Sequence, residues 1–166
     1  MLSPEKHLLL FNLSAEDLTA YGTLALAALA FVAGTIAALQ IIVGKYELRL
    51  GLAKSIYKDY LALAVENPEF SMPSYPIAKP PFKEFVADSL NYRKYEFYVS
   101  NLIFAAEEIL ELTQSSQEWR ATLQSQLQYH ALYFQTEDFP ESHYSKTILA
   151  LREVAIARYQ HEENGA

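Results

Sequence analysis

The sequence predicts an all-α membrane protein in which one N-terminal transmembrane helix continues into an antiparallel bundle of about four helices. An uncharged run of 27 residues lies between Asp17 and Lys45, and beyond it apolar residues recur every three or four positions. No stretch shows the strict alternation that is typical of a half-buried strand. The expected parts are an extracytoplasmic segment 1–14, a transmembrane helix 15–44, a cytoplasmic helical bundle 45–163 and a tail 164–166.

The uncharged run, residues 18–44, is long enough to cross a bilayer. At about 1.5 Å per helical residue it reaches about 40 Å, whereas the hydrocarbon core is about 30 Å thick. The core of a cleaved signal peptide is only about 7 to 15 residues long and follows basic residues, but here Glu16 and Asp17 come first. A retained span is the leading interpretation, and a buried soluble helix and a signal peptide are the alternatives.

The start of this helix is predicted at Ala15. Ser14 and Asp17 have the spacing of a capping box, and Leu13 and Leu18 have that of a hydrophobic staple. Acidic residues in the first turn also suit the positive end of the helix dipole.

Charge on either side of the span predicts its orientation. Residues 1–17 carry a net charge of −2, and residues 45–58 carry +3. Since basic residues beside a span favour the cytoplasmic side, we expect a single-pass protein of the plasma (inner) membrane with its N-terminus outside. The same residues can attract anionic lipid headgroups, each with about 1 kcal/mol. They are Lys45, Arg49, Lys54 and Lys58.

Small residues lie at every fourth position of the span, at Ala30, Gly34 and Ala38. This spacing lets two membrane helices approach closely, although alanine is so frequent here that chance is an alternative explanation. The polar side chains deep in the run are Thr23, Thr35 and Gln40, and none of them is ionisable, which argues against an ion path through the helix.

Apolar spacing predicts four helices beyond the span. The first continues without a break to Asn67-Pro68, a proline-rich loop covers 67–82, and a second helix covers about 84–113. A capping box of Ser115 and Glu118 starts the third helix, and Pro140 separates it from the last. The four expected buried faces are, in order, Tyr46, Leu50, Ala53, Tyr57, Tyr60 and Ala64; Tyr95, Val99, Leu102, Ala106, Ile109 and Thr113; Trp119, Leu123, Leu127, His130 and Phe134; and Tyr144, Ile148, Leu151 and Ala155.

Several chemistries lack their usual residues. The chain has no cysteine, only five scattered glycines and no His-Glu-x-x-His or Gly-x-Ser-x-Gly motif. Its nearest approach to a metal site is an acidic cluster on the second helix with two histidines elsewhere, and a solvated acidic face explains that cluster better. We expect no catalytic residue, metal or cofactor. The residues concerned are Glu107, Glu108, Glu111, His130 and His143.

His130 lies on the apolar face of its predicted helix, so we expect it to have a buried hydrogen-bond partner. Asn101 is one candidate for that partner. A core histidine is the leading interpretation, and a ligand-binding or pH-sensing role is the alternative.

A cluster of tyrosines and basic residues is the candidate surface for a ligand or partner. It can stack on and neutralise a planar anion, although tyrosine-rich helical faces are more often core or protein interface. The candidate residues are Tyr92, Arg93, Lys94, Tyr95 and Tyr98, with Trp119, Arg120 and His130 expected to face them.

The chain resembles a group of uncharacterised bacterial single-span membrane proteins with a cytoplasmic helical domain. The residues that carry the resemblance are Asn67-Pro68-Glu69, Tyr95-Glu96-x-Tyr98, Glu107 and Trp119. The resemblance covers most of the length, and the group has no established activity to transfer.

Two functions follow as hypotheses. The first is a noncatalytic interaction or accessory protein, which contacts membrane lipids and either its own copies or a larger membrane complex. The second is a membrane sensor or effector that binds a small anion near Arg93, Tyr95 and His130. Nucleic acid is not an expected partner because residues 59–166 carry a net charge of −8.

Overall fold

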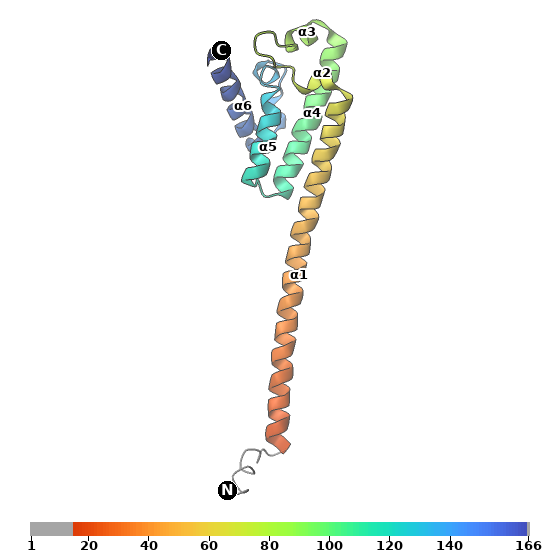
Figure 1. Ribbon diagram of the computed structural model, residues 1–166, viewed down its shortest axis with the longest axis vertical. Helices are drawn as coiled ribbons and strands as arrows, with labels where there is room; N and C mark the ends of the chain where they lie inside the picture. The colour runs from red at the N-terminus through yellow and green to blue at the C-terminus, as the bar shows by residue number, and fades with distance from the viewer. Residues whose placement is uncertain (1–14, 166) are drawn as a thin grey trace, which may run out of the picture. The chain divides into compact units, whose positions relative to one another are not determined.

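The computed structural model describes residues 15–165, and all the regular secondary structure in that range is helical. The all-α prediction is therefore confirmed for the described part of the chain. The predicted cap at Ser14 and staple at Leu13 lie outside it. Six α-helices follow one another (Figure 1): α1 (Ala15–Glu66), α2 (Pro68–Ser71), α3 (Phe82–Ala87), α4 (Ser89–Leu112), α5 (Gln117–Gln128) and α6 (Lys146–Gly165).

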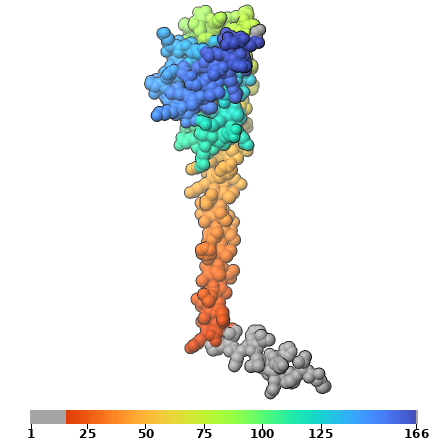
Figure 2. Space-filling view, turned by 90° about the vertical axis from the view of Figure 1, so that its left-hand side faces the viewer, coloured from red at the N-terminus to blue at the C-terminus, as the bar shows by residue number. Residues whose placement is uncertain are grey.

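The chain forms two compact units, which divide between Glu47 and Leu48. As predicted, α1 belongs to both and ends just before Asn67-Pro68. The second unit, called the helical domain below, contains the C-terminal part of α1 and all the other helices. Figure 2 shows the face of this domain that α6, in blue, covers.

The N-terminal part of α1 is apolar and exposed. Every side chain described from Glu16 to Glu47 is exposed, and Phe31 is exposed to 77%. The hydroxyls of Thr23 and Thr35 donate to carbonyls one turn earlier, so the helix itself satisfies them. By length and composition, with a mean hydropathy of 2.3, this is the one helix of the described residues that can span a membrane.

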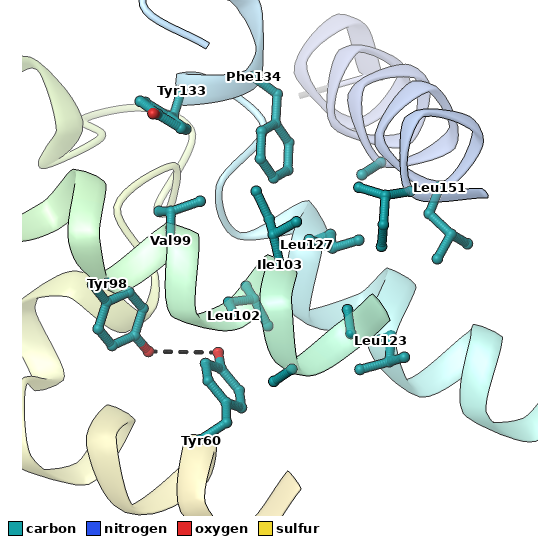
Figure 3. Close-up of a cluster of buried hydrophobic side chains, with 14 of the residues drawn as sticks. Tyr60, Tyr98, Val99, Leu102, Ile103, Leu123, Leu127, Tyr133, Phe134 and Leu151 are labelled. Atoms are coloured by element: carbon teal, nitrogen blue, oxygen red, sulfur yellow. Dashed lines mark hydrogen bonds between the residues drawn. The ribbon is translucent and has the colours of Figure 1, made fainter. Parts of the chain in front are cut away.

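The core of the helical domain is built around α4, which contributes nine buried residues. Figure 3 shows Val99, Leu102 and Ile103 of α4 beside Leu123 and Leu127 of α5, with Leu151 of α6 on the far side of the cluster. These side chains repeat every three or four positions, so each helix buries one stripe. The predicted faces of α4, α5 and α6 are thereby largely confirmed, and Tyr159 extends the last of them.

The predicted second helix, 84–113, is wrong as a single element because it is broken at Asp88. The backbone there is extended, with φ −110° and ψ 102°, and α3 ends one residue earlier. The Asp88 carboxylate accepts from the backbone N–H groups of Leu90 and Asn91, at 3.0 and 3.4 Å. An aspartate that caps the first turn of α4 in this way ends one helix and starts the next.

The third helix also differs from its prediction at both ends. Its cap is Ser116 rather than Ser115, since the Ser116 hydroxyl accepts from Trp119 N at 3.3 Å and Ser115 has a φ of 56°. The helix ends at Gln128, so His130 lies in the turn that follows and Phe134 in a short 3-10 helix. At the other end of the domain α6 runs to Gly165, which makes residues 164 and 165 helical rather than tail.

The proline-rich loop is held by Ser74, which is fully buried. Its backbone N–H donates to Tyr129 O at 3.0 Å, and its hydroxyl accepts from Leu132 N at 3.1 Å. The loop contains the short helix α2 and a cis peptide bond between Tyr75 and Pro76. It therefore packs on the turn after α5, next to His130.

Arg152 attaches α6 to the chain segment before it. The guanidinium donates to the main-chain oxygen of Phe134, forms an ion pair of 2.8 Å with Glu141 and lies 4.9 Å from the centre of the Phe139 ring. Its side chain is only 12% exposed. Neither the helical spacing nor the charge pattern singles out this residue, because its contacts come from a loop.

Replacing this arginine should destabilise the helical domain. Arg152→Ala leaves the Phe134 carbonyl without its charged donor, and hydrogen bonds to charged groups contribute about 1.5–3 kcal/mol each. We expect the free energy of unfolding of Arg152→Ala to be about 2 kcal/mol lower than that of the wild type in denaturant titrations. Arg152→Lys should have a stability between those of the wild type and Arg152→Ala. Lys146→Ala, an exposed change on the same helix, is the control. Equal stability of Arg152→Ala and the control would contradict this role.

Candidate functional site

The polar centre of the domain is a cluster of three tyrosines and one histidine, called the Tyr-His cluster. Tyr60 comes from α1, Tyr95 and Tyr98 come from α4, and His130 comes from the turn after α5. All four are buried. The helical register places the tyrosines inward, and the turn at Gln128 brings the histidine to them.

His130 is paired with Tyr95. The Tyr95 hydroxyl and His130 Nδ1 are 2.9 Å apart and share a hydrogen bond, and the two rings stack at 5.7 Å between centroids. The hydroxyl can donate or accept, so Nδ1 is satisfied in either neutral tautomer. Nε2 is also buried and has no hydrogen-bond partner among the described residues. The expectation of a buried partner is confirmed, but with Tyr95 in place of Asn101, whose amide donates to Phe97 O on the exposed side of α4.

Burial keeps this cluster uncharged. It lowers the pKa of His130 to about 3, since no carboxylate compensates for the lost hydration. Burial also raises the pKa of Tyr95 and Tyr60 well above the usual value near 10. Tyr98 donates to the Tyr60 hydroxyl at 3.5 Å, as Figure 3 shows, and Tyr60 donates to Gln126 Oε1 at 3.2 Å. Tyr98, Tyr60 and Gln126 are therefore linked as neutral donors and acceptors.

The predicted ligand surface does not form one surface. Tyr95, Tyr98 and His130 are buried, while Arg93 and Lys94 are exposed. Because α4 turns the two basic residues away from the buried tyrosines, an anion on Arg93 cannot also reach His130 without opening the core.

The remaining members of the predicted set have other neighbours. Tyr92 donates to the Asp138 carboxylate at 2.8 Å, and burial and this bond raise its pKa to about 12. Trp119 packs edge-on against Tyr57, at 5.5 Å between centroids. Arg120 is half-buried, and its Nε has no hydrogen-bond partner among the described residues. These residues belong to the packing between helices.

The predicted contact residues of α1 are exposed throughout. In the first unit, a Cβ added at Gly34 meets no described atom within 4 Å, and Ala30 and Ala38 are exposed. The basic residues predicted for lipid headgroups are exposed as well: Lys45, Arg49, Lys54 and Lys58.

The acidic cluster lies in a hollow of about 420 Å³, called the acidic groove, between α4 and the start of α6. It is lined by Glu107, Glu108 and Glu111 together with Phe104 and the loop around Ser145. Ser145 N donates to the Glu107 carboxylate at 2.9 Å, so one of these acids holds the loop before α6. Among residues 15–165, no group of three or more histidine and acidic side chains is arranged to hold a metal ion.

A second hollow was not foreseen from the sequence. This apolar groove of about 280 Å³ lies between the part of α1 within the helical domain and α4. Ile56, Asp59 and Leu63 line it from α1, and Asn101, Phe104 and Ala105 line it from α4. The sequence feature that indicates this groove is Phe104, a large apolar residue outside the predicted buried stripe of its helix.

Comparison of the chain with protein-family models, with curated proteins and with solved structures finds no match.

The Tyr-His cluster predicts a pH dependence of stability. The folded pKa of His130 is lowered to about 3, and the unfolded value is near 6.5, so below pH 6.5 the unfolded chain binds a proton that the folded chain does not. The stability is thus complete above pH 6.5 and is lost as the pH falls toward 3. At about 1.4 kcal/mol per pH unit, we expect a loss of about 2 kcal/mol between pH 7.5 and pH 5.

The measurement is denaturant unfolding of the full chain in detergent at a series of pH values. His130→Asn removes the titrating ring, so its stability should change less over this range, whatever its value at pH 7.5. His143→Asn removes an exposed histidine and should keep the wild-type slope. An unchanged slope in His130→Asn would show that this ring is not the titrating group.

Proposed function

We propose that the protein is a membrane-anchored, noncatalytic interaction or accessory protein, either a homo-oligomer or a small subunit of a membrane complex. The observation that carries this proposal is the N-terminal part of α1, which is apolar and exposed at every described position. Burying apolar surface contributes about 25 cal/mol per Å², so such a helix is stable only where lipid or protein covers it. Anchoring to the membrane supplies that cover.

The charge pattern supports one orientation. Lys45, Arg49, Lys54 and Lys58 follow the apolar run and are exposed, as residues that contact anionic headgroups should be. We therefore place the N-terminus outside and the helical domain in the cytoplasm, at the plasma (inner) membrane. In this proposal the domain is a mostly antiparallel bundle of four long helices, formed by the C-terminal part of α1 with α4, α5 and α6.

A role through contact, rather than through chemistry, is supported by the state of the polar core. His130, the histidine expected to be buried, is neutral and hydrogen-bonded to Tyr95. The Tyr98 hydroxyl donates to Tyr60, and the Tyr60 hydroxyl donates to Gln126. The open positions Ala30, Gly34 and Ala38 offer a surface for a second membrane helix. The resemblance to single-span membrane proteins with a cytoplasmic helical domain is consistent with the same proposal.

Membrane retention tests the anchoring. We expect the full-length protein to stay in the membrane pellet after washing with alkaline carbonate. Lysines at Leu29 and Ile36 together should release it, because each charge near the middle of a span costs about 3 kcal/mol. The matched control places lysines at Leu90 and Phe97, which are exposed on α4, and should remain in the pellet. Release of the wild-type protein by the wash would refute the proposal.

Labelling of single cysteines tests the orientation. The chain has no cysteine, so one introduced at Ser142 and one introduced at Ser3 can be followed separately. With a membrane-impermeant maleimide, position 3 should react in cells whose inner membrane is intact, and position 142 only after that membrane is opened. The reverse pattern would place the helical domain outside.

A further inference from the structure

Phe104 separates the apolar groove from the acidic groove and lines both. It lies on α4 and is 63% exposed, although it is one of the largest apolar side chains of the helical domain. The two grooves have volumes of about 280 and 420 Å³ and share this ring. They therefore form one continuous surface with an apolar part and a polar part, called the Phe104 surface below.

The charge of the Phe104 surface is of one sign. Asp59 lines the apolar part, and three glutamates, Glu107, Glu108 and Glu111, line the acidic part. Among the described residues, no lysine, arginine or histidine lines either groove. The surface therefore attracts a cation and repels phosphate, which disfavours nucleic acid and anionic lipid as its occupants.

A second copy of this chain fits the surface poorly. Two copies that meet through it bring the same carboxylates together, with no lining cation to compensate for them, and like charges at an interface oppose association. The occupant has to supply both an apolar side chain for the ring and positive charge for the glutamates.

A helix is the form that fits this position. The apolar groove lies between two helices, and a further helix packs into such a groove by inserting its own side chains between theirs. The described residues contain no strand whose edge an extended peptide can extend.

We propose that the Phe104 surface is the docking site for a cationic amphipathic helix of a partner protein. The apolar face of that helix covers Phe104 between Ile56 and Leu63, and its lysines or arginines face Glu108 and Glu111. This inference rests on the proposed role as an interaction protein and names the kind of partner.

Two synthetic helices test the proposal against the full-length protein in nonionic micelles. Both are fluorescent peptides of about 18 residues with leucines on one face, and the other face carries lysines in one and glutamates in its twin. Fluorescence anisotropy should show binding of the lysine peptide alone. Phe104→Ala and the double change Glu108→Lys with Glu111→Lys should each weaken it by at least about tenfold, as expected for residues at the centre of an interface.

The control is Val154→Ala, which shortens an exposed apolar side chain on α6 that lines neither groove, and it should bind like the wild type. Circular dichroism checks that each variant stays helical. Failure of the lysine peptide to bind, equal binding of its twin, or full binding to Phe104→Ala would each overturn the docking site. Membrane retention of each protein is measured by the alkaline carbonate wash before it is solubilised, so a protein that stays anchored but binds no peptide refutes the docking site alone.

Discussion

The constraint on which the rest depends is that the N-terminal part of α1 is apolar and exposed at every described position. The hydroxyls of Thr23 and Thr35 donate to carbonyls of the same helix, and the run is otherwise mostly apolar, so its exposure to water is costly. A bilayer removes that cost because it replaces water with hydrocarbon along the whole run. The proposed anchoring also gives the basic residues that follow a physical role, since charges next to an anionic surface hold the helix at a fixed depth.

The core of the helical domain shows the reverse arrangement, because polar side chains are buried there. His130 and the buried tyrosines are kept neutral by burial and are largely satisfied by one another, which gives the core a specific arrangement without any ion pair at its centre. The surface of the domain, by contrast, carries a large exposed apolar ring, Phe104, with carboxylates around it. An exposed apolar ring beside carboxylates is suited to binding other molecules, and in the proposed role anchoring to a membrane raises the effective concentration of the domain toward partners there.

Prediction from the sequence succeeded where one local rule acts and failed where two compete. The buried stripes of α4 and α6 follow from spacing alone, because a helix must bury its apolar face. The break at Asp88 was missed because the apolar spacing continues across it, while the carboxylate offers the backbone a cap that ends one helix and begins another. The predicted cap, Ser115, has a left-handed backbone, and the adjacent Ser116 caps the helix instead.

The sequence by itself determined the helical class, the apolar run and its charged flanks, since each depends on residues that are close together along the chain. Only the tertiary structure decided that His130 pairs with Tyr95 rather than Asn101, that Arg93 and Lys94 point away from that pair, and that α1 and α4 leave a groove beside Phe104. The residues that meet in the Tyr95–His130 pair and in the groove lie tens of positions apart along the chain. Their meeting is set by the turn after Gln128 and by the way the helices pack against one another, which local spacing does not encode.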